Sequence, residues 1–513
     1  MLLTWGRRLS SWHRWLGVGF GLLFALWFAT GAVMIYVPFP SLGDGARIAS
    51  AAPVSLAALR MTPSQALAAA GGTPVDRLRL VDVLGAPRYV LHLTGGRMLA
   101  VAGQGLRAMG DDALAREAPA LDARRAAQVA AGFAGQPVLP QQMHGPLDHD
   151  QWTVHQRFDG ARPFYRADLG DAAGTQLYVS ARTGEVLQRT TRFERGWNWV
   201  GAVVHWIYPT VLRQHFDAWD QTVWWLSLAA IATALLGFAL GVLRTVNLRR
   251  RRGSGASPFR GWLRWHHLLG LSAGVLLLGW VFSGWLSMDH GRLFSVDQPV
   301  TDEVARWRGM PLEKAVEGVT LAQLSEGAGA REIEFIAVGG QAFVVLRGGG
   351  PVPQRQAGTG ASWVVAAGLM PDLSTATTAL PDALLRAAAD RAWSQQGVTG
   401  LAPIAADDAY GHLRNDPLPP AARRITLGDV GRTWVHVDAA SGRIVSVMDR
   451  SRRVYRWLFN GLHTFDFPLL NRAGALWKVL MLMALACGFA LSATGVVLGV
   501  RRLRRSFRGL RAG

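Results

Sequence analysis

Long apolar runs alternate along this chain with stretches in which polar and apolar residues are mixed. Four runs, at about residues 15–37, 222–243, 268–288 and 475–500, carry at most one charged residue each. Each has about the 20 residues that a helix needs to cross the hydrocarbon core of a bilayer. The pattern therefore predicts four transmembrane helices, and the mid-chain recurrence of the first run argues against a cleaved signal peptide.

The same pattern occurs twice. Residues 12–31 (WHRWLGVGFGLLFALWFATG) and 265–284 (WHHLLGLSAGVLLLGWVFSG) open on Trp-His and reach a Ser/Thr-Gly pair, 253 residues apart. A second register of 258 residues relates His205 to His463. Both copies would run in the same direction, so a pseudo-twofold axis along the membrane normal would relate them. The predicted fold is thus four transmembrane helices in two parallel repeats, with two α+β domains on one side.

The two mixed segments, 38–221 and 289–474, carry the signals of short helices and strands. Thr62-Pro63 begins a helix, because Pro is favoured in the first turn. The Gly- and Pro-rich residues 348–360 predict a loop. Predicted helices cover 64–70, 122–133, 321–326 and 382–393; predicted strands cover 78–84, 88–93, 152–158, 164–168, 176–180, 186–189, 332–338, 342–346, 425–427, 433–437 and 444–448.

The net charge of +19 is concentrated beside the apolar runs. Residues 1–14, 244–265 and 501–513 hold 16 Arg and no acidic residue, whereas the other 38 Lys and Arg nearly balance 35 Asp and Glu. This distribution follows the positive-inside rule and predicts an inner-membrane protein with both termini and the middle loop in the cytoplasm. Juxtamembrane arginines meet anionic lipid, so we expect no nucleic-acid partner. The single cysteine, Cys487, excludes a disulfide or a Cys-based metal site within one chain.

These signals divide the chain into eight parts. They are a cytoplasmic N-terminus with the first span (1–37), a periplasmic domain (38–196), a His-containing interfacial segment with the second span (197–243), a basic cytoplasmic loop (244–265), the third span (266–288), a second periplasmic domain (289–452), a second His-containing interfacial segment with the fourth span (453–500) and a basic tail (501–513).

Two stretches resemble a known family. Residues 435–442 (VHVDAASG) give the pattern strand-Asp-x-x-Ser/Thr-Gly, and residues 457–468 (WLFNGLHTFDFP) surround His463. With the four spans, they make the chain similar to the PepSY-associated transmembrane proteins over nearly its whole length. The resemblance implies that both periplasmic domains are PepSY-like. It also implies a kinship with haem-containing inner-membrane reductases of ferric siderophores.

Four of the thirteen histidines form a pattern. His13 and His266 are repeat equivalents at the cytoplasmic ends of the first and third spans, and His205 and His463 are equivalents just outside the second and fourth. Equivalent residues that face a twofold axis face each other, so each pair would offer two axial imidazoles to a macrocycle on that axis. Bis-His ligation leaves no open iron position and suits electron transfer. We therefore predict two haem b groups per chain, held by these four residues.

Other histidines are weaker candidates. His267 adjoins His266, but one residue turns a helix by about 100°, so both cannot ligate one iron from the same face. His290 ends the third span and is a weaker candidate for the outer haem. His144, His149 and His155 have irregular spacing, which is more typical of a solvated loop than of a metal site.

The leading hypothesis is a transmembrane ferric siderophore reductase that releases iron by reducing Fe(III). The cytoplasmic segments are too short to hold a flavin or nicotinamide, so electrons would come from a separate reductase or a quinol. The alternative is a haem-free scaffold whose PepSY-like domains bind peptides or regulate a periplasmic protease, with the histidines serving packing. Transport is a weaker alternative, because the spans contain no acidic residue at mid-depth.

Overall fold

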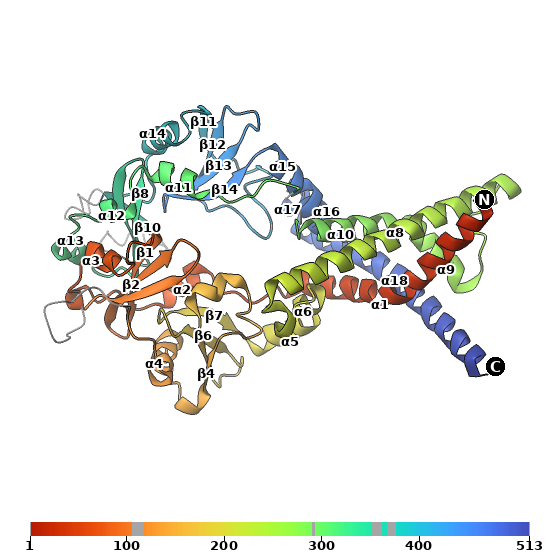
Figure 1. Ribbon diagram of the computed structural model, residues 1–513, viewed down its shortest axis with the longest axis horizontal. Coiled ribbons are helices and arrows are strands. Elements are labelled where there is room, and N and C mark those ends of the chain that lie inside the picture. The colour runs from red at the N-terminus through yellow and green to blue at the C-terminus, as the bar shows by residue number, and fades with distance from the viewer. Residues whose placement is uncertain (1, 105–116, 290–292, 350–361, 367–375, 512–513) are drawn as a thin grey trace.

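The computed structural model describes residues 2–104, 117–289, 293–349, 362–366 and 376–511 (Figure 1). The molecule is elongated, with sheets gathered at one end and long helices at the other. Both chain termini lie at the helical end. We call positions near the sheets sheet-proximal and those toward the termini sheet-distal.

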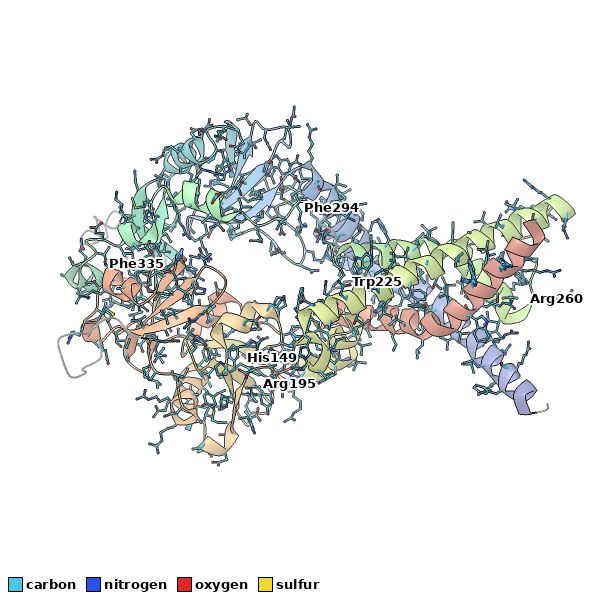
Figure 2. All side chains as sticks on the ribbon, viewed as in Figure 1. His149, Arg195, Trp225, Arg260, Phe294 and Phe335 are labelled. Carbon is cyan, nitrogen blue, oxygen red and sulfur yellow. The ribbon has the colours of Figure 1, made fainter. Side chains whose placement is uncertain are left out.

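The helical end consists of three long helices and one bent pair. Helices α1 (Leu2–Tyr36), α8 (Phe216–Arg252) and α18 (Gly474–Arg511) are long and apolar enough to cross a membrane. Helices α9 (Gly261–Ser272) and α10 (Gly274–Leu286) meet at an angle of 60° and add a fourth span if they act as one. The outer surface of the bundle exposes apolar side chains, such as Trp225 on α8, which is 60% exposed (Figure 2).

The third predicted span, 266–288, is therefore not one straight helix. The break falls at Ala273, between Ser272 and Gly274 in a segment that also contains Gly270. The Ser272 hydroxyl donates to the carbonyl of Leu268 at 3.0 Å. A Ser side chain that bonds back to the preceding turn bends a helix, and neighbouring glycines do not resist the bend.

Close helix contacts depend on small residues. Helix α1 packs along α18, and α10 packs along α8. A Cβ added to Gly21 of α1 would lie 3.6 Å from the backbone nitrogen of Val496 in α18. Glycine lets the two backbones approach closely, which is a common basis of helix association in bilayers. The core between the helices mixes aromatic and aliphatic side chains, and its aromatic members include Phe24, Phe28, Trp280 and Trp477.

The other end of the molecule contains three antiparallel sheets. A six-stranded sheet has the order β10-β9-β8-β1-β2-β3, and two four-stranded sheets have the orders β4-β5-β6-β7 and β11-β12-β13-β14. The strands are β1 (Val75–Val83), β2 (Ala86–Leu93), β3 (Met98–Ala102), β4 (Met143–Leu147), β5 (Phe164–Asp168), β6 (Gln176–Ser180), β7 (Val186–Thr190), β8 (Glu332–Val338), β9 (Gln341–Arg347), β10 (Ser362–Ala366), β11 (Val398–Pro403), β12 (Ala422–Leu427), β13 (Trp434–Asp438) and β14 (Arg443–Met448).

Short helices cover these sheets and connect them to the bundle. Helix α4 (Ala123–Ala134) packs on the first four-stranded sheet and α14 (Asp382–Ala392) on the second. The remaining helices are α2 (Asp44–Ser50), α3 (Pro63–Ala68), α5 (Arg192–Val200), α6 (Ala202–His205), α7 (Thr210–Arg213), α11 (Thr301–Arg308), α12 (Leu312–Ala315), α13 (Leu321–Ser325), α15 (Arg450–Arg456), α16 (Leu462–Thr464) and α17 (Pro468–Arg472), with a π-helical turn at Trp457–Gly461.

The six-stranded sheet joins the two mixed segments of the chain. Strand β1 pairs antiparallel with β8, and Leu80 lies opposite Ile333. These two residues are 253 positions apart, the register that relates residues 12–31 to residues 265–284. The segments 38–196 and 289–452 therefore share a sheet, and each also has a four-stranded sheet of its own.

A buried ion network lies where β1 meets β8. Arg79 donates to Glu185 and to Glu332, both at 2.8 Å, and Arg47 donates to the same carboxylates at 3.0 and 2.8 Å. Burial alone would raise the pKa of Glu185, but the charges of Arg79 and Arg47 outweigh it and lower the pKa to about 2. Because a buried charge needs a partner, this network fixes how the two segments meet.

Candidate functional site

The structure brings the four predicted histidines together in two facing pairs. The ring centroids of His13 and His266 are 6.3 Å apart at the sheet-distal end, with the ring planes inclined by 33°. The ring centroids of His205 and His463 are 6.4 Å apart at the sheet-proximal end, inclined by 75°. Each pair takes one side chain from each half of the chain.

Different elements carry the two pairs. His13 and His266 lie on α1 and α9, within the long bundle. His205 ends α6 and His463 lies in α16, and both of these short helices pack against the bundle at its sheet-proximal end. Along α1, His13 and Thr30, which contacts His205, are seventeen residues apart. At 1.5 Å per residue, the pairs are about 25 Å apart along that helix.

The separation within each pair fits a shared metal centre. A bond from a metal to an imidazole nitrogen is about 2 Å long, and the nitrogen lies about 1 Å from its ring centre, so two axial rings have centres about 6 Å apart. The observed 6.3 and 6.4 Å match this distance. The residues present therefore fit the predicted macrocycles.

Hydroxyl groups fix the tautomer of three of the rings. Thr30 donates its proton to the carbonyl of Trp27 at 3.2 Å, so its oxygen accepts from Nδ1 of His205 at 3.0 Å. Ser283 donates to the carbonyl of Trp280 at 3.0 Å and accepts from Nδ1 of His463 at 3.0 Å. A neutral imidazole that donates from Nδ1 presents the lone pair of Nε2.

The sheet-distal pair uses one hydroxyl and one carbonyl. Thr494 donates to the carbonyl of Leu491 at 2.6 Å and accepts from Nδ1 of His266 at 2.9 Å. Nδ1 of His13 donates to the backbone carbonyl of Thr233 at 3.2 Å. Metal-bound histidines typically make such a bond with the nitrogen that does not bind the metal, which orients the ring and raises its basicity. All four rings thus present Nε2 as the free base.

Each ring also lies against a glycine. An added Cβ on Gly31 would be 3.6 Å from Cε1 of His205, and one on Gly284 would be 3.4 Å from Cε1 of His463. At the sheet-distal pair, the corresponding distances are 3.5 Å for Gly495 and His266, and only 2.5 Å for Gly237 and His13. A side chain at Gly237 would displace the ring of His13. The glycines therefore leave room for the imidazoles inside a packed bundle.

The turns after His205 and His463 have the same strained geometry. Ile207 and Phe465 are two residues beyond these histidines, and each has φ of 50°, which is rare for such side chains. The indole of Trp219 donates to the carbonyl of Trp206 at 3.0 Å, and the indole of Trp477 to that of Thr464 at 2.8 Å. Strained backbone persists only where its surroundings hold it, and it often marks functional sites.

The remaining histidine candidates lie elsewhere. Nε2 of His267 hydrogen-bonds Thr245 at 3.0 Å, so this ring is not part of the His13–His266 pair. His290 lies outside the described residues. His144 hydrogen-bonds Asp168 at 3.0 Å. Within the described ranges, no three His, Cys, Asp or Glu side chains gather to hold a metal ion, and a pair of axial histidines falls below that number.

Aromatic side chains pack against His463, whereas two tryptophans before His205 are largely exposed. Phe459 stacks on His463 with a centroid distance of 5.5 Å. Trp280, which the sequence did not single out, donates from its indole to the carbonyl of His463 at 2.8 Å. Trp197 and Trp199 are 46% and 51% exposed and so present much of their surface outward.

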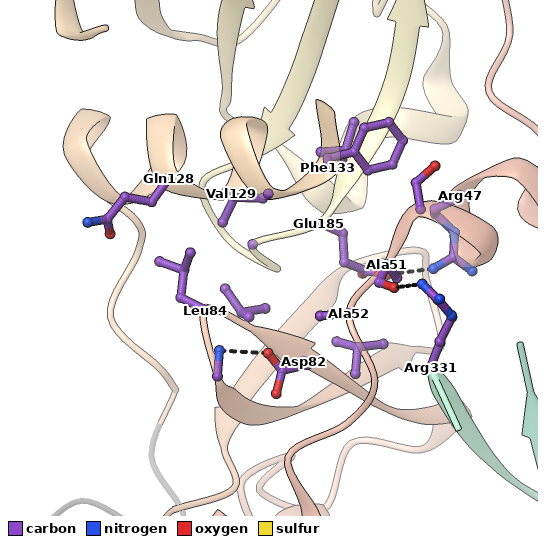
Figure 3. Close-up of a pocket in the computed structure, with 17 residues that line it drawn as sticks. Arg47, Ala51, Ala52, Asp82, Leu84, Gln128, Val129, Phe133, Glu185 and Arg331 are labelled. Atoms are coloured by element: carbon purple, nitrogen blue, oxygen red, sulfur yellow. Dashed lines mark hydrogen bonds and ion pairs between the residues drawn. The ribbon is translucent and has the colours of Figure 1, made fainter. Parts of the chain in front are cut away.

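A separate cavity of about 360 Å³ lies among the sheets. Its walls include α2, α4 and the turn after β1, with Phe133, Leu84 and Arg331 among the lining side chains (Figure 3). Its basic side chains are occupied: Arg47 in the ion network and Arg331 on the carbonyls at the end of α2. The cavity is therefore mostly apolar in character and distinct from the histidine pairs.

Sequence reasoning missed the residues that orient the rings. The Ser/Thr-Gly pairs at residues 30–31 and 283–284 mark the repeat, and they supply both the hydroxyl and the glycine for His205 and His463. The spacing of such a pair within an apolar run is the signal that would have identified them. No comparable signal marks Thr233, because its contact is a backbone carbonyl.

Comparison with known proteins agrees with this architecture. The model of the PepSY-associated TM region matches residues 10–502. A search of curated proteins finds no match. The family match covers nearly the whole chain, including all three sheets and most of every helix in the bundle. The chain therefore belongs to the PepSY-associated TM family of membrane proteins.

Proposed function

We propose that this protein is a di-haem b oxidoreductase of the bacterial inner membrane. It would pass electrons from the cytoplasmic side to an acceptor in the periplasm. One observation carries the proposal: four histidines from two halves of the chain form two pairs with the spacing of axial ligands, at opposite ends of one bundle. Haem held in this way supplies one-electron transfer without an open position for oxygen.

The protein's own groups do the remaining work. Thr30, Ser283 and Thr494 hold three of the imidazoles with Nε2 facing inward, and the carbonyl of Thr233 holds the fourth. The apolar bundle excludes water from the pairs, which tunes the potential of a bound metal. The separation of about 25 Å between the pairs along α1 nearly spans a hydrocarbon core of about 30 Å.

The proposed orientation rests on the arginines. Both termini and the basic loop between α8 and α9 lie at the sheet-distal end, which the positive-inside rule assigns to the cytoplasm. The sheets and the pair His205–His463 would then face the periplasm. We propose four spans in two parallel repeats, with α9 and α10 acting as one bent span and the two sheet-containing segments as PepSY-like domains.

The acceptor and donor follow from the family resemblance and from what the chain does not contain. A ferric siderophore is the proposed acceptor, because reducing Fe(III) to Fe(II) with one electron weakens its hold in a hard-oxygen chelate. The electron donor would be a cytoplasmic reductase or a quinol, since the cytoplasmic segments are too short to form a flavin domain.

The first test is a dithionite-reduced minus oxidised spectrum of the detergent-purified protein, combined with a pyridine haemochrome assay. We expect two b-type haems per chain. His463→Ala should remove one haem and leave the other, and His13→Ala should remove the other one. A colourless protein after haem-replete expression would overturn the proposal.

A haem-free peptide-binding scaffold remains the second candidate, because the cavity of about 360 Å³ among the sheets is large enough for several side chains of a peptide. A colourless protein that binds extended peptides would favour this function.

A further inference from the structure

Two arginines lie against equivalent tryptophans at the sheet-proximal end. The guanidinium carbon of Arg213 is 4.6 Å from the ring centroid of Trp219, and that of Arg414 is 3.8 Å from the ring centroid of Trp477. Trp219 and Trp477 are 258 residues apart and begin the second and fourth spans. Each half of the chain thus places one guanidinium on its equivalent tryptophan.

The two arginines reach this place from different sequence positions. In the 258-residue register, Arg213 corresponds to Asn471, and Arg414 corresponds to Gln156. Arg213 and Gln156 are neighbours, since Nη2 of Arg213 donates to Oε1 of Gln156 at 3.5 Å. One half therefore takes its guanidinium from the helix before the span, and the other takes it from a loop of the sheets. The two arginines are therefore not copies of one residue. The halves share the position of the guanidinium beside the tryptophan, not the sequence position of the arginine.

Both guanidinium groups have buried nitrogens without a partner. Arg213 is only 3% exposed, and its Nε is buried without a hydrogen bond to any described residue. Arg414 is half-buried, and its Nε and Nη2 are also buried without a hydrogen bond to any described residue. Asp466 accepts from the backbone nitrogen of Arg414, but its side chain already binds Arg456 at 3.0 Å and Asn471 at 2.6 Å. Arg213 also lies 5.1 Å from the ring centroid of Tyr208 and 5.0 Å from that of Phe216. A buried guanidinium nitrogen without a hydrogen bond is costly, so both groups have donors available for an anion.

The arginines are also close to the turns that follow the histidines. Trp219 and Trp477, on which they stack, hold the carbonyls of Trp206 and Thr464. Those carbonyls belong to the residues directly after His205 and His463. One aromatic ring thus separates each guanidinium from a turn that carries a proposed ligand.

We propose that Arg213 and Arg414 each bind one carboxylate of the haem held by His205 and His463. Haem b carries two propionates on one edge, and a twofold axis in its plane that passes between them exchanges both the propionates and the two axial faces. A site that supplies one histidine and one arginine from each half matches this symmetry. An arginine fork binds a carboxylate through two parallel hydrogen bonds. The inference rests on the proposed function.

The test is a redox titration of purified Arg414→Gln, Arg414→Lys and Arg213→Gln proteins, with haem content measured on the same samples. Removing the positive charge leaves a carboxylate uncompensated, which disfavours adding an electron. We expect a lower midpoint potential for one haem, the one lost in His463→Ala, and no change for the other. Arg414→Lys should restore much of the wild-type potential because it retains the charge. Arg386→Gln serves as the control, since Arg386 is exposed and paired with Asp390.

Each outcome decides the question. A wild-type protein without haem would overturn the proposed function and this inference together. Two haems with unchanged potentials in all three variants would overturn the inference alone. The inference would also be wrong if Arg414→Gln slows reduction of an added ferric chelate while both potentials stay fixed, because the arginine would then serve the incoming anion. If Arg213→Gln does not fold, the two Arg414 variants still test the inference.

Discussion

The four paired histidines are each oriented by the group that binds Nδ1. In three cases that group is a Ser or Thr hydroxyl whose proton is committed to the carbonyl three residues earlier, so only its oxygen is available to the ring. His13 instead uses a helix carbonyl. The difference follows from sequence, because position 236, which corresponds to Thr494, is Leu. The same ring orientation is thus reached by two different hydrogen bonds.

The glycine beneath His13 gives a direct test of ring placement. A Cβ on Gly237 would lie 2.5 Å from Cε1 of His13, so Gly237→Ala must displace the ring from its partner. We expect the haem content to fall from two to about one per chain, with the loss at the sheet-distal pair. Pyridine haemochrome assays measure this. Gly17→Ala is the matched control, because its Cβ would meet nothing within 4 Å; equal haem loss in both variants would contradict the placement.

The sequence predicted which histidines pair, but not what holds them. Two registers, of 253 and 258 residues, were enough to match His13 with His266 and His205 with His463. Thr30 and Ser283 are equivalent in the two halves, and their spacing could have identified them, whereas Thr494 and the carbonyl of Thr233 have no such signal, because position 236 is Leu. The arginines on Trp219 and Trp477 were not predicted, because they occupy different positions in the two copies.

Periodicity identified most of the helices and strands. The strands at 164–168, 176–180 and 332–338 are confirmed to the residue. The strand expected at 152–158 is wrong: Arg162 donates to the carbonyl of Thr153 at 2.7 Å, and residues 156–161 form a 3₁₀ turn. Strands β3, β4, β10 and β11 were missed, because each has only five or six residues and so shows little periodicity. The predicted loop at 348–360 falls almost entirely outside the described residues.

The pairing of β1 with β8 could not be anticipated from either strand alone. Both strands are largely buried, and Glu332 in β8 is 1% exposed. A sequence reader would take such a glutamate for an edge or surface residue. It is buried because Arg47 and Arg79, from the other half, bind it.

Glu332→Gln tests this junction. It leaves Arg79 with only Glu185 and removes a carboxylate that also binds Arg47. Removing one partner of a buried ion pair lowers the free energy of unfolding by about 3–5 kcal/mol, because the remaining charge is left unpaired. For a domain of this size, the apparent Tm should fall by about 10 °C, measured by a thermal-shift assay in detergent. Glu317→Gln, at an exposed position, should leave the Tm nearly unchanged; equal effects would rule out a special role for the network.

The whole molecule combines one shared sheet with one shared bundle. Each half contributes three strands to the six-stranded sheet, and each contributes one histidine to each pair. Neither half can complete a pair by itself. The arrangement thus couples assembly of the sheets to assembly of the bundle, since the segments that carry His205 and His463 follow directly after the four-stranded sheets in sequence.

The proposed electron transfer across a bilayer would require both pairs at once. In proteoliposomes with a reductant and a small mediator enclosed, and a ferric chelate outside, the wild-type protein should produce external Fe(II), which a colorimetric chelator detects. His13→Ala should abolish this production, because it would remove the proposed sheet-distal haem. The remaining haem should still be reduced by dithionite added outside, which shows that the variant is folded. His463→Ala should also abolish Fe(II) production, but its remaining haem should be reduced from the inside. Undiminished Fe(II) production in either variant would mean that electrons bypass one pair, and the proposed path would be wrong.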